Sequence, residues 1–375
     1  MARVVPPMDA LRELARVLVD APAFAACAGR DAYQRALWHL AVRHSVHLVL
    51  AWRVAEDKAG QWHSQCGAAA REALADASVL EELQRRELTR LSAAFAHRGI
   101  PALLLKGAAW AYSLYARPVL RPRDDTDVLV DQSSRDRADS LLLSLGYEPA
   151  VENVMQLASG QRHYRRVDEQ RVVHPLDLHW RVTNPLVFAD ALPFERLWAR
   201  SVAMPIPGAR TLCDVDGLLL ACLHRLAHHG NASELLWLMD IHLLASAITA
   251  EQWNEFTREA ESGGLRGVCA QSLLSAVTCF GTEIPTDVEA WLHRAARELP
   301  ERVFLGHGVS PLGLLFSDWR AIGTWKGRLR LMKDHVYPAR SYMVARYGPR
   351  HPWLLPLLYG RRAIGGLRRW VMQGR

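Results

Sequence analysis

The chain of 375 residues carries a formal net charge of +7, and half of its residues are hydrophobic. This length suffices for two or three domains, and the composition excludes a disordered or collagen-like protein. The sequence shows no secretory signal, no run of the roughly 20 apolar residues that a membrane-spanning helix needs, and no C-x-x-C pair among its six cysteines. We therefore expect a soluble, cytoplasmic protein with reduced thiols and no transmembrane segment.

The first part of the chain has a helical pattern. Apolar residues recur at steps of three and four between residues 9 and 97, and Gly99 follows as a helix C-cap. From Asp214 onward the same spacing returns in several segments. We expect an N-terminal helical region at residues 1–98 and a C-terminal helical region at residues 208–375.

The middle of the chain alternates short apolar runs with helical segments. Residues 100–105 and 126–130 have the length and composition of strands, and residues 162–167 and 171–182 are rich in β-branched and aromatic residues. Helices are expected at residues 108–116 and 133–146. The fold class is therefore α+β, with a mixed sheet in a core at residues 99–207 between the two helical regions.

Three aspartates stand at the start of the strand expected at residues 126–130. Alternate residues of a strand share one face, so Asp125 and Asp127 point the same way, whereas Asp124 does not and is expected to pair with Arg121 or Arg123. Two carboxylates side by side repel unless a cation lies between them. Oxygen ligands favour Mg²⁺ or Mn²⁺, which proteins bind together with substrate phosphates.

Two further features complement this carboxylate pair. Lys106 and Gly107 occupy a strand-to-helix junction, where free backbone amides and a cation suit a phosphate. Asp177 is an acid inside an apolar, aromatic strand, where an unpaired charge is costly to bury. A site with two metal ions commonly uses a third carboxylate, and Asp177 is the best candidate.

These residues resemble the nucleotidyltransferase superfamily typified by DNA polymerase beta, and more specifically a bacterial family of uncharacterised nucleotidyltransferases. The resemblance covers most of the chain. Its motifs are Lys106-Gly107, Tyr115, Arg121 or Arg123, Asp125-Thr126-Asp127, Asp177-Leu178-His179-Trp180, and a helical pattern of His224, His228, Trp237 and Asp240. This sequence has Gly107-Ala108 where the superfamily commonly has Gly-Ser or Gly-Gly.

The resemblance implies a polymerase beta-like sheet and a metal-dependent transfer of a nucleoside monophosphate from a nucleoside triphosphate, with ATP as the expected nucleotide and pyrophosphate as the product. It implies that Asp125, Asp127 and Asp177 are the catalytic residues and hold Mg²⁺ or Mn²⁺. The nucleotide-binding candidates are Lys106, Gly107, Ala108 and Arg123, and His179 and Trp180 are candidates for an acceptor pocket. The acceptor stays open between protein, RNA and small molecules.

Other interpretations remain. The chain could be a non-catalytic nucleotide- or partner-binding module of the same fold, or a glycosyltransferase, since those enzymes also use Asp-x-Asp for a metal and a diphosphate. His224 and His228 lie one helical turn apart, and we expect a structural role for them, with Asp240 accepting a hydrogen bond from one imidazole.

The end of the chain is basic. From Trp319 to the end there are 13 Lys and Arg residues and a single acidic residue, Asp334. This basic tail suits contact with a polyanion such as nucleic acid, an acidic glycan or a lipid surface, or else it only solvates helix surfaces.

Overall fold

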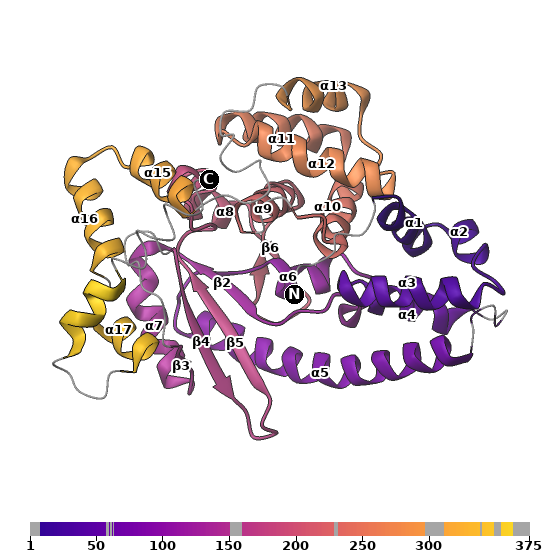
Figure 1. Ribbon diagram of the computed structural model, residues 1–375, viewed down its shortest axis with the longest axis horizontal. Helices are drawn as coiled ribbons and strands as arrows, with labels where there is room; N and C mark the ends of the chain where they lie inside the picture. Colours follow the sequence, from indigo (N-terminus) through magenta and orange to yellow (C-terminus); the bar gives the residue numbers. More distant parts are fainter. Residues whose placement is uncertain are drawn as a thin grey trace.

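The computed structural model describes residues 8–57, 60, 62, 64–150, 160–228, 232–296, 311–337, 340–348 and 354–362. A mixed sheet of seven strands forms its centre. In Figure 1 the long helix α5 lies at the lower right, helices α9 to α12 lie in the upper part of the view, and strands β4 and β5 lie to the left of α5. This architecture confirms the α+β class.

The sheet has the order β3-β4-β5-β2-β1-β7-β6. Strand β2 is parallel to β5, and β1 is parallel to β7, while the other pairs are antiparallel. The predicted strands are all present, and the very short β3, β6 and β7 were not predicted. The strands are β1 (Ala102–Leu105), β2 (Thr126–Val130), β3 (Glu148–Pro149), β4 (Gln161–Val167), β5 (Val173–His179), β6 (Val202–Ala203) and β7 (Arg210–Thr211).

Helices precede, interrupt and follow the sheet. The first group is α1 (Met8–Val19), α2 (Ala21–Ala25), α3 (Asp31–Arg43), α4 (His47–Glu56) and α5 (Ser64–His97). Within the sheet region lie α6 (Lys106–Ser113), α7 (Arg135–Ser144), α8 (Phe194–Ala199) and the 3-10 turns η1 (Pro118–Leu120), η2 (Gln132–Ser134) and η3 (Leu186–Phe188). The last group is α9 (Asp214–Ala227), α10 (Leu235–Ala247), α11 (Ala250–Ser262), α12 (Arg266–Phe280), α13 (Thr286–Ala295), α15 (Pro311–Ala321), α16 (Trp325–Val336) and α17 (Arg340–Tyr347).

The two helical groups share one hydrophobic core. Buried side chains from Leu11 in α1 to Ala295 in α13 form a continuous cluster that includes the central strands, and α1 packs on α12. The division into regions 1–98, 99–207 and 208–375 stays a prediction, and the last strand of the sheet lies at Arg210–Thr211. Gly99 ends α5 as predicted, in the left-handed conformation with φ of +57°.

The sheet has two different faces near its centre. Leu104 and Val128 line a small apolar cavity together with Leu91 and Phe95 of α5, so these strand residues face α5. Side chains alternate along a strand. Asp127, next to Val128, therefore faces the opposite side of the sheet.

A buried ion pair joins α10 to the segment before β2. Asp240 accepts hydrogen bonds from Arg121 (Nη2 at 2.7 Å) and from the hydroxyl of Tyr115 (2.8 Å), and the side chains of Arg121 and Asp240 are 8% and 1% exposed. Two expectations are thereby corrected. The donors to Asp240 are these residues and not an imidazole, and Arg121 pairs with Asp240 rather than with Asp124.

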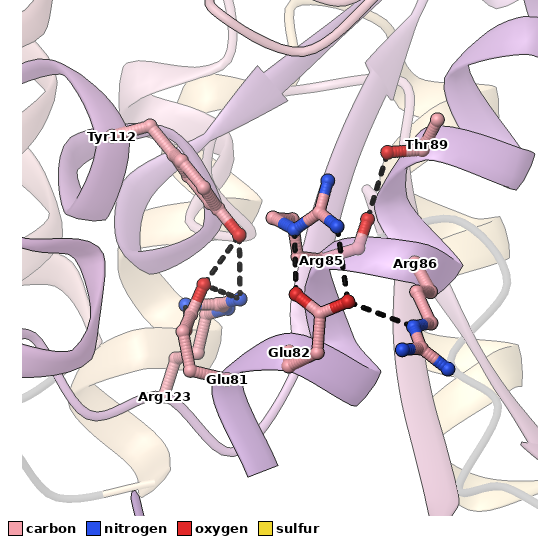
Figure 2. Close-up of polar contacts among 7 residues, drawn as sticks. All are labelled: Glu81, Glu82, Arg85, Arg86, Thr89, Tyr112 and Arg123. Carbon is pink, nitrogen blue, oxygen red and sulfur yellow. Dashed lines mark hydrogen bonds and ion pairs between the residues drawn. The ribbon is translucent and has the colours of Figure 1, made fainter. Parts of the chain in front are cut away.

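The burial of this ion pair predicts a large effect of breaking it. Asp240→Ala should lower the free energy of unfolding by about 3–5 kcal/mol, because the Arg121 guanidinium is then left buried without its counter-charge. Glu82 of α5 is the matched control, since its carboxylate accepts from the exposed Arg85 and Arg86 (Figure 2). Glu82→Ala should leave the midpoint of the same urea titration nearly unchanged, because solvent screens an exposed ion pair, and equal losses for the two variants would contradict the assignment.

Candidate functional site

The pairing of β2 with β5 brings two of the predicted aspartates together. Asp127 lies directly opposite Asp177 in the parallel register of these strands. His179 lies two residues after Asp177, on the same face of β5. Asp127, Asp177 and His179 each offer a possible metal-ligand atom, and these atoms lie within 4.8 Å of one another. The register of two strands whose paired residues are 50 positions apart in the chain thus creates a cluster of potential ligands.

Asp127 is the most buried of the three aspartates and has two basic partners. Its Oδ1 atom is 2.7 Å from Lys106 Nζ and 2.7 Å from His179 Nε2. Burial raises the pKa of this carboxyl, but Lys106 and His179 outweigh burial and hold the pKa below its ordinary value. Asp127 is therefore an ionised carboxylate inside the protein.

The backbone at Lys106 is strained. This residue has φ of +48°, a left-handed conformation that a residue with a side chain seldom adopts. It stands where β1 ends and α6 begins, so the strained turn directs its ammonium group to Asp127. Such strain is often found at functional sites, where the surrounding structure holds it in place.

Asp125 lies beside the cluster, immediately before β2, and is exposed. Its local desolvation and repulsion from Asp127 and Asp177 raise the pKa of its carboxyl to about 6. The structure thus brings the three predicted aspartates close enough to repel one another. The set of converging ligand atoms is made by Asp127, Asp177 and His179, with Asp125 adjacent to it.

Strand β4 adds two residues that the sequence did not identify. His163 lies opposite Asp177 in the antiparallel register, and its Nδ1 atom contacts Asp177 Oδ1. Gln161 donates from Nε2 to Asp177 Oδ2 at 3.2 Å. The strand itself was predicted, and its alternation marks Gln161 and His163 as residues of one face, but only the register places them on Asp177.

The predicted nucleotide-binding residues lie in two different environments. Gly107 and Ala108 are buried in the first turn of α6, next to Lys106. A Cβ atom at Gly107 would lie 2.6 Å from Arg121 Nη1, so this position admits no side chain without displacement of Arg121. Figure 2 shows that the Arg123 guanidinium meets Glu81 of α5 and lies beside Tyr112. Arg123 Nη1 is 2.6 Å from Glu81 Oε2. Arg123 is therefore paired within the protein.

The other expected residues lie at different depths. His179 is completely buried, while Trp180 is half-buried and lies under the guanidinium of Arg135, 5.3 Å from the ring centroid. Of this pair, Trp180 is the residue that a bound molecule can reach.

The imidazoles of His224 and His228 lie close together. Their ring centroids are 5.0 Å apart, and His228 Nε2 lies 3.3 Å from the hydroxyl of Thr183.

The ligand set fits a divalent cation. Asp125, Asp127 and Asp177 repel one another in its absence, and a bound cation removes this repulsion. His179 meets this cluster through Nε2, which lies 2.7 Å from Asp127 Oδ1. Carboxylate oxygens suit Mg²⁺ and Mn²⁺.

The fold and this site define an α+β protein with a carboxylate-rich cluster at the junction of β1, α6, β2 and β5. The chain belongs to a family of uncharacterised nucleotidyltransferases, whose model matches residues 31–281. This match confirms the resemblance that the motifs indicated, and it includes the site residues and Asp240. A search of curated proteins found no match.

No helix in the described part of the chain has both the length and the apolar character required to cross a membrane.

The close approach of Arg121 to Gly107 predicts the effect of adding one methyl group. Gly107→Ala should lower the free energy of unfolding by about 1–3 kcal/mol, because Arg121 must move away from its place against the turn. Gly67 in α5 is the control, since a Cβ atom there would meet Arg71 Nη1 at an ordinary 3.4 Å. Gly67→Ala should be neutral or stabilising by less than about 1 kcal/mol. If both variants behave alike in urea titrations, the packing argument fails.

Repulsion at Asp125 predicts a pH-dependent gain in stability for a neutral variant. The pKa of Asp125 lies above its ordinary value of 3.8, so the folded protein holds this proton more tightly than the unfolded chain, and stability falls as pH rises from 3.8 to about 6. Without divalent cations, Asp125→Asn should therefore raise the melting temperature above about pH 6 and change it little below 3.8. A lower melting temperature at high pH would show that Asp125 makes a favourable contact.

Proposed function

We propose that the protein is a metal-dependent enzyme that transfers a nucleoside monophosphate from a nucleoside triphosphate to an acceptor and releases pyrophosphate. The observation that carries the proposal is the alignment of Asp127 with Asp177 on neighbouring strands, beside Lys106 and the start of α6. Membership of a nucleotidyltransferase family supports the type of reaction. We further propose that the sheet is of the polymerase beta type.

The proposed reaction is an in-line displacement at the α-phosphorus. An acceptor oxygen forms the new bond to phosphorus, the bond to the pyrophosphate oxygen breaks, and the acceptor proton passes to a base. Mg²⁺ or Mn²⁺, held by Asp125, Asp127 and Asp177, would neutralise charge on the attacking and leaving oxygens. Asp177 lies at the side of the cluster near β4, where His163 and Gln161 orient its carboxylate. Its proposed role is to help activate the acceptor oxygen.

The chain's own groups divide the remaining tasks. Lys106 holds Asp127 ionised and supplies a cation next to the phosphates, while the backbone amides at Gly107 and Ala108 start α6, where the helix dipole favours an anion. Arg123 would have to exchange Glu81 for a phosphate to contact the nucleotide. Trp180, which is half-buried, is the residue of the predicted acceptor pocket that an acceptor can reach. We propose that ATP is the nucleotide and that the protein acts in the cytoplasm.

A screen with labelled nucleotides tests this function. The protein is incubated with Mg²⁺, cell extract and each of four nucleoside triphosphates labelled at the α-phosphate, and the labelled product is identified by mass spectrometry. Asp127→Asn and Asp177→Asn should lose labelling by more than about 100-fold, since even outer-shell changes at metal sites cost 10–100-fold. Asp124→Asn is the matched control, because this exposed neighbour has the opposite strand parity. Unchanged labelling in Asp127→Asn would refute the assignment.

The same samples separate the alternatives. A non-catalytic module would show a thermal shift with a triphosphate and Mg²⁺ but leave no label on any acceptor. A glycosyltransferase would instead be stabilised by sugar nucleotides such as UDP-sugars. Because Asp127→Asn also removes the partner of a buried lysine, circular dichroism of each variant must show that the fold persists before activities are compared.

A further inference from the structure

Helix α16 carries an exposed apolar stripe that the proposed reaction does not use. Trp325, Leu329, Met332 and Val336 follow one another at steps of four, three and four residues. At 100° per residue these positions fall on one narrow face of the helix. Their exposed fractions are 66%, 60%, 37% and 36%. Large exposed apolar patches usually mark an interaction surface.

The orientation of this stripe is fixed by the other side of the helix. Leu331 is fully buried in a small cluster with Leu315, Trp319 and Ile322. The Arg328 guanidinium donates to the carbonyl oxygens of Trp319 and Ile322 and lies 4.4 Å from the Trp319 ring centroid. Because Leu331 anchors the helix from roughly the opposite side, the stripe cannot turn into the cluster without breaking these contacts.

Exposed cations border the stripe along one edge. Lys326, Arg330 and Lys333 are all exposed, and their helical angles place them next to Trp325 and Leu329 on the side away from Arg328. The only acid of α16 is Asp334. The helix therefore presents apolar side chains in the centre of its outer face and positive charge beside them. Arg350, Arg368, Arg369 and Arg375, which also belong to the predicted basic tail, lie outside the described residues.

We infer that α16 is an interfacial helix that docks this protein on the surface of an anionic lipid bilayer. A helix with Trp and Leu on one face and Lys and Arg on the polar side lies in the plane of the membrane interface, with its apolar face among the headgroups and its cations on anionic lipids. At 12 residues it is about 18 Å long. A nucleic-acid surface would use the cations and leave the aliphatic stripe in water, so the stripe favours lipid.

The unit that carries the stripe is attached to the sheet. Asp318 of α15 accepts a hydrogen bond from the backbone amide of Leu186 at 2.8 Å, and Leu186 begins η3, in the segment after β5. Figure 1 shows α16 at the outer edge of the molecule, far from α11 to α13. Docking through α16 would thus hold the body of the protein at the membrane without covering helices α9 to α13.

Vesicle sedimentation of the full-length chain tests this inference. The protein should sediment with vesicles of phosphatidylcholine and phosphatidylglycerol in equal parts and stay in solution with vesicles of phosphatidylcholine alone. Leu329→Glu should weaken sedimentation by about 10-fold or more, because it places a charge in the apolar stripe. Leu143→Glu is the matched control: Leu143 is also a helical leucine, 49% exposed, on α7. The control variant should sediment like the unmodified protein.

Exchange of the cations tests the second half of the inference. A variant with Lys326→Gln and Lys333→Gln should lose binding most strongly at low salt, where electrostatic attraction to the lipid is least screened. The inference is overturned if the unmodified protein does not bind anionic vesicles, or if Leu329→Glu sediments as well as Leu143→Glu. It is also overturned if the protein binds only a nucleic-acid duplex and Leu329→Glu leaves that binding intact. Thermal melts of all variants confirm that each is folded.

Discussion

The structure depends on two carboxylates that are held side by side within a sheet. The parallel register of β2 and β5 sets Asp127 opposite Asp177, and Asp125 stands immediately before β2. Like charges at this separation repel, and burial makes the repulsion stronger. Lys106 and His179 satisfy Asp127, and His163 and Gln161 satisfy Asp177, while Asp125 keeps a raised pKa. This remaining excess of negative charge is what a divalent cation would balance.

Two groups stand out among the residues by which the chain resembles its family. Lys106, His179 and the three aspartates make the site. Tyr115, Arg121 and Asp240 make a buried network that holds α10 against the segment leading into β2, and Gly107 gives Arg121 the room to lie there. Because Lys106 directly precedes Gly107, displacement of Arg121 would also disturb the turn that directs the lysine to Asp127. The second group therefore acts on the chemistry through the position of the first.

The sequence predicted the parts of this arrangement that arise from local pattern. Strand alternation placed Asp125 and Asp127 on one side, and length and composition identified β1, β2, β4 and β5. It did not predict the long-range partners, because nothing local specifies them: Arg121 and Asp240 are 119 positions apart. The assignment of His163 to Asp177 needed the register of β4 on β5. The two-residue strands were missed because so few residues carry no periodic signal. The sequence likewise does not show which face of α16 is exposed, whereas the burial of Leu331 in the structure does.

The central claim is that the aligned aspartates form a cation site for a nucleoside triphosphate. The most direct measurement is a crystal structure of the protein grown with Mn²⁺ and a non-hydrolysable triphosphate, with the anomalous scattering of manganese recorded. The account predicts an anomalous peak bonded to Asp127 and Asp177, with the triphosphate between this peak and the start of α6. Manganese found elsewhere on the protein, with Asp127 still bound only to Lys106 and His179, would contradict it.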